Sequence, residues 1–551
     1  MSAGGVSRTP ASVAVHVDVV RRLEATAMAQ LPEGTLMQRA AAAIAVSAGS
    51  MLRATSGRVT GSRVVLLVGS GDNGGDALYA GARLAKRGAR VDALLVADKH
   101  HVDGAAALRR AGGRCHVVQL PPAQVPGEPR LRLVEADDEE PRDGAGVDEV
   151  ADLLAAAELV AAADLVVDGI LGIGGRGALR EPSATLALVA RETDALVLAV
   201  DLPSGVDADI GEALDPSRAI DADRTVVLGV LKPGLLVGDG AVLSGDLEVV
   251  DIGLDLADVA DDEALVLVGD ALAREVLERP GPRDDKYSRG VVGLSTGSAT
   301  YPGAGVLSTG GARHGLAGYV RFSGPAYREV VQAWPDVVAD PGPVGDAGRV
   351  QAWVVGSGRG TDQDGKQAVL DAVAVHVPVV LDADALSLLA IDAEIQEEVE
   401  ARSAPTLVTP HDGEFDRLAR AAIGPERVRA ARGLARELRC VVLLKGSSTI
   451  VAPPSGPSYV ALAAPAELAT AGSGDVLAGL LGSLIAHHEA RAQAAGRRLD
   501  ENDVARIAAV AAHVHGRAGV EAAGEGRTVT ALDVAHALPT AIARIRTGPG
   551  S

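Results

Sequence analysis

Residues 64–87 read VVLLVGSGDNGGDALYAGARLAKR. The apolar run Val64–Val68 predicts a buried strand, and Leu78–Arg87 has the spacing of an amphipathic helix. Between them lies the glycine-rich turn Gly69–Asp76. Glycines at such a turn let the backbone approach a pyrophosphate, and the start of the helix offers N–H donors to an anion. A tight connection can also need glycine for positive φ alone, so the turn by itself leaves a structural role open.

Further apolar, β-branched runs alternate with helical patterns along the chain, which predicts parallel α/β folds. A first series of strands is expected at Val64–Val68, Ala93–Val96, Leu165–Asp168, Leu196–Asp201 and Thr225–Leu228. A second series is expected at Val291–Leu294, Tyr319–Phe322, Ala352–Val355, Val377–Asp382, Thr406–Val408 and Val441–Leu444, with helices at Gln363–Val375, Glu426–Leu438, Asp475–His488 and Asp503–Val520. The segment Asp255–Pro282 between them is acidic and then proline-rich. We therefore expect two domains, residues 1–262 and 263–551.

Composition narrows the class of protein. A chain of 551 residues is too long for one core. Aromatic residues are only 2% of the chain, so Val, Leu and Ala must build the core, as they do in helix-flanked parallel sheets. A net charge of -21 argues against nucleic acid or an anionic membrane as a partner. Cys115 and Cys440 lie far apart, which fits a reducing compartment, and we expect a cytoplasmic protein because no secretory signal begins the chain.

Residues 120–150 differ from their surroundings. They contain five prolines and the acidic cluster Glu135–Glu140. This composition predicts a surface insertion or mobile loop, for which a solvated spacer is the simplest interpretation.

Two more polar clusters in the first half follow predicted strands. They are Asp168–Gly174 and Asp201–Asp207. Ligands of an open α/β sheet bind at the carboxyl ends of its strands, so these clusters and Gly69–Asp76 are expected to meet in one crevice. Helix capping is the alternative role for Asp201 and Ser204.

In the second half, Ala469–Leu477 reads ATAGSGDVL and leads from a loop into an apolar helix. Small residues there expose backbone N–H groups that can cradle a transferring phosphoryl group. Asp475 is placed to accept a hydroxyl proton, although it could also be an ordinary first-turn acid that supports the helix dipole.

Other second-half clusters have the same placement after strands. Lys445–Thr449 suits the phosphates or adenine side of a nucleotide, although an isolated hairpin turn means little. Thr409–Phe415 contains His411, and a lone histidine is more often structural than a ligand contact. Three further clusters are Lys286–Gly290, Pro302–Gly305 and Val355–Gly360.

Together, the first-half clusters resemble the signatures of the NAD(P)H-hydrate epimerase family, whose fold is Rossmann-like, and Leu36–Ala40 resembles its opening segment. This resemblance implies that Asn73, Asp168 and Ser204 supply oxygen ligands to K⁺, for which hard oxygen donors are suitable. It also implies a binding site for the hydrated nicotinamide nucleotide at Asp72, Asn73, Gly74, Gly75, Asp76, Gly172, Ile173, Gly174, Gly175, Arg176, Gly177, Ala178 and Asp201. Because epimerisation needs a proton shuttle, we consider Asp201 the candidate catalytic carboxylate. The family usually has Asn where this chain has Asp72.

The second-half clusters resemble the ADP- or ATP-dependent NAD(P)H-hydrate dehydratases, which have a ribokinase-like α/β fold, from about Asp285 to Leu538. The resemblance assigns Ala304, Gly358, His411 and Asp475 to the hydrated dinucleotide, with Asp475 as catalytic residue. It assigns Lys445, Gly446, Ser447, Ser448, Thr449 and Gly474 to the adenine nucleotide. His411-Asp412-Gly413 stands where the family has His-Pro-Gly, and Ala466–Leu468 replaces a segment containing Gly-Met.

The two resemblances together imply a bifunctional repair enzyme. Its epimerase domain would interconvert the R and S hydrates NADHX and NADPHX. Its dehydratase domain would return the S form to NAD(P)H with Mg²⁺ and ADP, giving AMP and phosphate. One alternative is a small-alcohol kinase, since such folds share the Gly-Ser-Gly-Asp motif, and another is a non-enzymatic binding protein. The sequence is compatible with a homo-oligomer.

Overall fold

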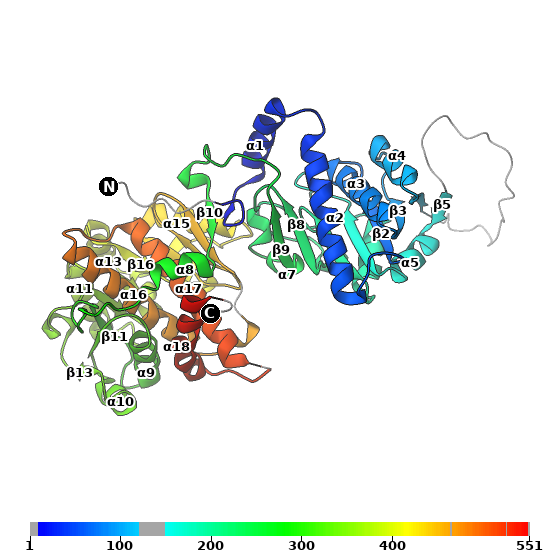
Figure 1. The fold of residues 1–551 in the computed structure, drawn as a ribbon. Helices are drawn as coiled ribbons and strands as arrows, with labels where there is room; N and C mark the ends of the chain where they lie inside the picture. The colour runs from blue at the N-terminus through cyan, green and yellow to red at the C-terminus, as the bar shows by residue number, and fades with distance from the viewer. Residues whose placement is uncertain (1–8, 121–148, 463–464, 525, 549–551) are drawn as a thin grey trace, which may run out of the picture. The chain divides into compact units, whose positions relative to one another are not determined.

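The computed structural model describes residues 9–120, 149–462, 465–524 and 526–548. They group into two compact units, Met1–Val259 and Ala260–Ser551. Each unit is built on its own sheet, which Figure 1 shows with helices around it. The insertion expected at residues 120–150 lies from 121 to 148 outside the described residues.

The first unit contains a wholly parallel sheet with the strand order β5-β4-β3-β2-β6-β7-β8-β9. The strands are β2 (Arg63–Val68), β3 (Arg90–Leu95), β4 (Arg114–Gln119), β5 (Glu149–Asp152), β6 (Leu165–Gly169), β7 (Leu196–Val200), β8 (Arg224–Leu228) and β9 (Asp246–Val250). The chain runs outward from β2 in one direction and outward from β6 in the other. The order therefore reverses between β2 and β6, where α/β sheets bind their ligands.

Helices cover both faces of this sheet. On one face α3 (Asp72–Lys86) packs between α2 (Thr35–Ser56) and α4 (Val102–Arg110). On the other, α5 (Leu153–Ala161) and α6 (Ser183–Arg191) join a buried cluster with alternate strand residues such as Val65 and Leu67. This is the three-layer, Rossmann-like arrangement predicted from the sequence. The remaining long helix of the unit is α1 (Val17–Gln30).

The second unit has a mixed sheet with the order β10-β19-β18-β17-β16-β15-β14-β11-β12-β13. Its strands are β10 (Leu265–Leu267), β11 (Val291–Ser295), β12 (Tyr319–Ser323), β13 (Val338–Asp340), β14 (Ala352–Val355), β15 (Val379–Leu381), β16 (Thr406–Val408), β17 (Val441–Leu444), β18 (Thr449–Ala452) and β19 (Ser458–Ala461). Only β18 runs antiparallel to its neighbours. The parallel strands β14 to β17 are adjacent, so the loops that follow them share one edge of the sheet.

Two groups of helices flank this second sheet. One group comprises α8 (Asp270–Val276), α9 (Pro302–Arg313), α16 (Ser473–Ala494), α17 (Glu501–Ala523) and α18 (Ala531–Thr547). The other comprises α11 (Gln363–Ala374), α12 (Asp384–Ile391), α13 (Ala393–Ala401), α14 (Asp412–Ala419) and α15 (Arg427–Leu438), and α10 (Tyr327–Ala333) lies beside α9 and β13. Helices α9 and α16 approach closely, because a Cβ at Gly479 would lie 1.8 Å from the Ser308 carbonyl oxygen.

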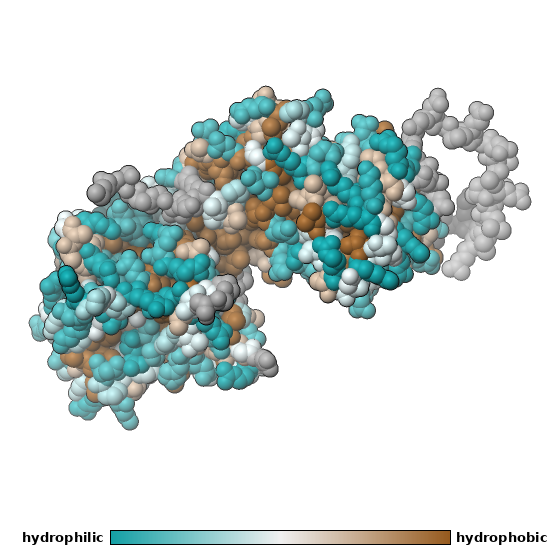
Figure 2. All heavy atoms as spheres, in the orientation of Figure 1, coloured by the Kyte–Doolittle hydropathy of each residue, from teal (hydrophilic) through white to brown (hydrophobic). Residues whose placement is uncertain are grey.

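The α/β fold class predicted from the sequence is confirmed, with two differences in detail. Helix α3 begins at Asp72, so the cluster Asp72–Asp76 forms its first turn instead of preceding it. The acidic and proline-rich segment Asp255–Pro282 contains strand β10 and helix α8, too short to give a strong periodic signal. Among the described residues, no helix is long and apolar enough to cross a membrane. Figure 2 shows hydrophilic residues over much of the visible surface of the second unit.

Candidate active sites of the two units

The first candidate site lies where the strand order reverses, between β2 and β6. The Gly69 N–H donates to the Gly169 carbonyl at 3.0 Å, joining the ends of the two strands. A Cβ at Gly69 would lie 1.9 Å from the Ile170 carbonyl oxygen, so only glycine allows this approach. The first turn of α3 and the loop after β6 are thereby held together.

The three predicted cation ligands meet at this point. Asn73 is buried, and its side-chain N–H₂ donates to the carbonyls of Leu171 and Val200, both at 2.9 Å. Ser204 donates its hydroxyl to Asp168 Oδ1 at 2.7 Å and its backbone N–H to Oδ2 at 2.8 Å. Burial raises the pKa of Asp168 to about 6, although the bonds from Ser204 oppose the rise. A buried carboxylate next to the Ser204 hydroxyl, with no basic side chain paired to it among the described residues, suits an alkali cation.

Asp201 follows β7 and is held in an ion pair that the sequence did not reveal. Its Oδ1 accepts the Leu228 N–H at 2.9 Å and a hydrogen bond from Lys232 Nζ. Lys232 is fully buried, so each charge depends on the other. Asp201 also has a φ of 66°, a strained conformation for a non-glycine residue. Neither of its oxygens bonds Asn73, Asp168 or Ser204.

Three further carboxylates lie around this pair. Asp72 and Asp76 are in the first turn of α3, and Glu24 comes from α1. Burial raises the pKa of Glu24, and the negative charges of Asp201 and Asp72 add to the rise while Lys232 opposes it. Asp76 is buried, and its Oδ1 has no hydrogen-bond partner among the described residues.

The predicted loop Gly172–Ala178 is half-exposed to exposed and lies beside these groups. Gly172 borders the Asn73 side chain, since a Cβ there would be 3.3 Å from Asn73 Oδ1. A Cβ at Gly174 would be 3.9 Å from an Arg21 nitrogen of α1. The predicted first-half residues Asp72–Asp76, Gly172–Ala178, Asp168, Asp201 and Ser204 are therefore brought to one edge of the sheet, while Gly174, Arg176, Gly177 and Ala178 are exposed to solvent.

The second candidate site surrounds the start of α16. Gly472 precedes the helix with a φ of 88°, and Asp475 lies in its first turn. Burial, and then the negative charge of Asp382, raise the pKa of Asp475 to about 7, while a hydrogen bond from Ser357 and the Lys445 charge oppose the rise. A carboxyl group that titrates near neutral pH can accept a proton as a general base.

Asp382, at the end of β15, connects the loops of this edge. It is buried and accepts hydrogen bonds from Ser357 Oγ at 2.8 Å, Thr409 Oγ1 at 2.7 Å and Lys445 Nζ at 2.9 Å. Despite burial, the Lys445 charge and these bonds leave the pKa of Asp382 below its usual value. The next residue, Ala383, has a φ of 51°, so backbone strain occurs here as at Asp201. Asp382 therefore stays charged and holds Lys445 in place.

Lys445 faces the helix that carries Asp475. A Cβ at Gly474 would lie 3.9 Å from Lys445 Nζ, and the same nitrogen lies 3.7 Å from Glu414 Oε2. Attraction to Asp382 and Glu414 raises the pKa of Lys445 in spite of its burial. A fixed cation thus stands next to the predicted phosphate cradle.

His411 caps α14 as well as bordering this network. Its Nδ1 accepts the N–H groups of Gly413 at 3.1 Å and Glu414 at 3.3 Å, and its Nε2 lies 3.5 Å from Glu414 Oε1. The ring is more than half exposed. His411 therefore has a structural role, as the cap of α14. The exposed edge of its ring remains free to contact a ligand.

The other predicted residues lie on the same side of the sheet. Gly358, with a φ of 62°, packs against Ala304, since a Cβ there would be 2.8 Å from the Ala304 Cβ. Gly446, Ser447, Ser448 and Thr449 form the turn from β17 into β18. Ser448 is buried with an Oγ that has no partner among the described residues, whereas Gly446 and Ser447 are exposed.

Sequence reasoning missed several residues of the two sites. They are Glu24 and Lys232 in the first unit and Ser357, Asp382, Thr409 and Glu414 in the second. Ser357, Thr409 and Glu414 lie inside the clusters that the sequence singled out, so their position was available but not their role. Lys232 precedes Pro233 in an apolar run and gave no signal by itself.

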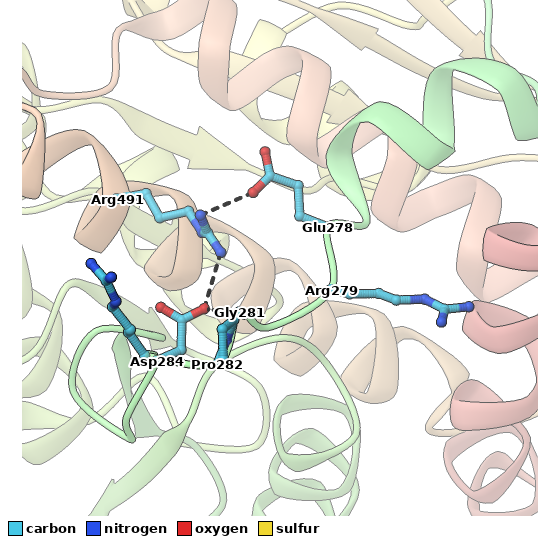
Figure 3. Close-up of a pocket in the computed structure, with 7 residues that line it drawn as sticks. Glu278, Arg279, Gly281, Pro282, Asp284 and Arg491 are labelled. Atoms are coloured by element: carbon cyan, nitrogen blue, oxygen red, sulfur yellow. Dashed lines mark hydrogen bonds and ion pairs between the residues drawn. The ribbon is translucent and has the colours of Figure 1, made fainter.

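A separate cavity of about 510 Å³ lies at the far end of α16. Figure 3 shows Arg491 between Glu278 and Asp284, while Arg279 extends away. The Arg491 nitrogens lie 3.1 Å from a Glu278 oxygen and 3.4 Å from an Asp284 oxygen. Arg491 is sixteen residues along α16 from Asp475, or roughly 24 Å at the helical rise. Because its central arginine already pairs with both acids, we assign this cavity no role in the chemistry.

Both units are α/β layers, one on a parallel sheet and the other on a largely parallel sheet, with acidic side chains at the carboxyl edge, which defines a two-domain α/β enzyme. The family model described as YjeF-related protein N-terminus matches residues 33–234, and the model of NAD(P)H-hydrate dehydratase matches residues 292–540. These matches bear out the resemblances stated for each half. The chain belongs to the family of bifunctional NAD(P)H-hydrate repair enzymes, as the relatives below show.

The bifunctional NAD(P)H-hydrate repair enzyme Nnr of Mycobacterium tuberculosis is 44% identical over 85% of this chain and 88% of its own length. That of Corynebacterium glutamicum is 34% identical over 96% of this chain and 98% of its own length. Among solved structures, an ADP/ATP-dependent NAD(P)H-hydrate dehydratase from Bacillus subtilis, co-crystallised with ATP and Mg²⁺, is 23% identical with a TM-score of 0.43. It covers 52% of this chain and is itself matched over 100% of its length.

Proposed function

We propose that the chain repairs hydrated nicotinamide cofactors in two steps. The first unit interconverts the R and S forms of NADHX and NADPHX, and the second dehydrates the S form to NAD(P)H with ADP, releasing AMP and phosphate. The observation that carries this proposal is the position of Asp475 beside Lys445 at the start of α16, in a chain whose two halves match both parts of the repair family.

In the dehydratase step, Asp475 removes the proton from the ring hydroxyl of the hydrate as that oxygen attacks the terminal phosphorus of ADP. The N–H groups of Ala471–Gly474 and the Lys445 ammonium stabilise the transferring charge. The ring nitrogen then donates electrons, the phosphate leaves with its C–O bond electrons, and loss of a proton from the neighbouring carbon restores the dihydronicotinamide ring of NAD(P)H. Phosphorylation matters because phosphate leaves readily and hydroxide does not.

Mg²⁺ would accompany the nucleotide. Among the described residues, no three His, Cys, Asp or Glu side chains gather so as to hold a metal ion. This fits a cation that arrives on the nucleotide phosphates and keeps much of its own water. When bound, it would neutralise phosphate charge near Asp475, whose own carboxyl group already feels the negative charges of Asp382 and Asp384.

We propose K⁺ as the cation of the first unit, held by oxygens of Asn73, Asp168 and Ser204. Replacing K⁺ in the buffer by tetramethylammonium is expected to slow epimerisation at least about tenfold, or 1.4 kcal/mol, and to leave dehydration of pure S hydrate unchanged. K⁺ should also raise the melting temperature of the first unit, more at pH 8 than at pH 5, because protons compete for Asp168. Equal melting curves in both salts for the wild type and Asp168→Asn would contradict this site.

The whole proposal is tested by adding the protein, Mg²⁺, K⁺ and either ADP or ATP to a mixture of both NADPHX epimers. Reduced nicotinamide is followed by its absorbance, under conditions where spontaneous epimerisation is slow. We expect full recovery of NADPH, and the faster nucleotide identifies the phosphoryl donor. Recovery limited to the S fraction would show that the chain does not convert the R form and so lacks the epimerase activity. A phosphorylated product that accumulates without elimination would favour the small-alcohol kinase.

We propose a cytoplasmic location on chemical grounds. The substrates are damaged forms of cofactors that work inside cells. The chain has only two cysteines, both of them buried, and Cys440 is a free thiol, which suits a reducing compartment.

A further inference from the structure

Asp76 is the buried acid of the first unit that no interaction explains. Its side chain is only 6% exposed in the first turn of α3. Its Oδ1 accepts no hydrogen bond from any described residue, and no described cation pairs with the carboxyl group. Most buried polar groups in native proteins are satisfied, so such an exception calls for a reason.

The charges around Asp76 are mostly negative. Glu24 faces it from α1, Asp72 from its own helix and Asp201 from the end of β7, and burial together with these three charges raises the pKa of Asp76 well above its usual range. Lys232 is engaged with Asp201, and the His101 ring borders Gly75. Burial and these negative charges therefore favour the protonated form of the Asp76 carboxyl group.

Asp201, by contrast, already has a hydrogen-bond partner and an ion-pair partner within the protein. Its Oδ1 receives both the Leu228 N–H and Lys232 Nζ, and its strained backbone fixes the side chain at the end of β7. If Asp201 took up a proton, Lys232 would be left as an uncompensated buried cation. The sequence pointed to Asp201 for the proton transfer, whereas the geometry makes Asp201 a fixed counter-ion.

We propose that Asp76 is the proton-transfer residue of epimerisation and that Asp201 acts as a positioning residue through Lys232. This inference rests on the proposed epimerase activity of the first unit. It explains the buried free oxygen of Asp76, because that oxygen would meet the substrate hydroxyl. It also explains why two acids of one site have such different partners.

The step balances with one carboxyl group. The protonated oxygen of Asp76 gives its proton to the ring nitrogen while its other oxygen takes the proton of the substrate hydroxyl. The C–N bond breaks with its electrons going to nitrogen, and the hydroxyl oxygen forms a C=O bond. After rotation of the aldehyde carbon, the reverse transfers close the ring on the other face. Asp76 ends as it began, and no oxidant or reductant is needed.

The first test is Asp76→Asn, which keeps the size of the side chain and removes the acid. We expect kcat for epimerisation to fall about 100-fold or more after subtraction of the spontaneous rate, with KM changed less than threefold. Asp76→Glu should restore part of the rate. Asp103→Asn, which removes an exposed carboxylate from α4 of the same unit, is the matched control and should leave the rate unchanged.

The pH profile separates catalysis from a structural role. Because the acid form reacts, the epimerase rate should fall as pH rises through the raised pKa of Asp76. Glu24→Gln and Asp201→Asn each remove a negative neighbour, so both should move this fall to lower pH. Should Asp201→Asn prove too unstable, Glu24→Gln provides the same readout from the surface helix α1.

The outcomes are distinguishable. If the wild type is active but Asp76→Asn keeps at least a third of its rate, the role of Asp76 is overturned. The same follows if the fall in rate at high pH disappears in Asp201→Asn. Neither result would remove the epimerase activity itself. A wild type that does not epimerise would instead remove the proposed function. Dehydration of pure S hydrate by every variant reports that the chain is intact.

Discussion

Asp475→Asn is expected to lower the dehydratase rate by about 10³-fold while nucleotide binding persists, since general-base catalysis contributes roughly 10²–10⁴-fold. Asparagine has nearly the same size and shape as aspartate, but it cannot take the hydroxyl proton of the hydrate. Single-turnover assays with S-NADPHX, together with calorimetric titration of ADP, separate the chemical step from binding. Glu437→Gln, which removes one exposed carboxylate from α15, is the matched control.

The pH dependence of the same residue gives a second signature. Asp475 acts as a base only when ionised, so kcat/KM should fall as pH decreases through about 7. A profile that stays flat between pH 6 and 8, or an Asp475→Asn variant with more than a tenth of the wild-type rate, would exclude Asp475 as the base.

The stability of the folded chain should depend on pH in the opposite direction to the dehydratase rate. The folded-state pKa of Asp475 is raised from 3.8 to about 7, so the folded chain holds this proton more tightly than the unfolded chain. The associated stability is present below pH 4 and is lost as pH rises to 7. Asp475→Asn should therefore melt at a higher temperature than the wild type at pH 8, because its free energy of unfolding is larger by at most about 4 kcal/mol. The two proteins should melt alike at pH 4, as thermal unfolding of the second unit would show.

Much of the fold follows from local pattern. The runs at Val64–Val68 and Val441–Leu444 form strands as predicted, because β-branched residues in short apolar runs fit a sheet buried on both faces. The prediction that Asp475 accepts a proton also came from local pattern, because glycine, serine and an acid at a helix start combine N–H donors with a proton acceptor. Strands such as β10 and β13 have only three residues, and their pairing depends on neighbours distant in sequence.

The charge pairs were not accessible to local pattern. Lys232 meets Asp201 because β8 lies next to β7, and Lys445 meets Asp382 because β15, β16 and β17 are adjacent. Strand order is a property of the whole sheet, and single-sequence motifs do not encode it. For this reason the sequence assigned Lys445 to the nucleotide alone and Asp201 to proton transfer, before their partners were known.

The Asp201–Lys232 pair should show the largest stability effect in the first unit. Lys232→Met leaves Asp201 as a buried charge without its partner, and Asp201→Asn does the same to Lys232. Breaking a buried pair from one side costs about 3–5 kcal/mol, whereas replacing both charges is often neutral or stabilising. We therefore expect each single variant to melt roughly 10 °C lower and the double variant Asp201→Asn/Lys232→Met to melt near the wild type.

The double variant also separates stability from chemistry. With Asp76 intact and the fold restored, its epimerase should retain a fall in rate at high pH, at a reduced maximum because the positioning pair is gone. Calorimetry of the first unit and the epimerase pH profile, measured on the same samples, give both readouts. Melting temperatures that add across the two single variants would show that the pair is not coupled. If stability returned but every pH-dependent rate were lost, the proton transfer would belong to Asp201.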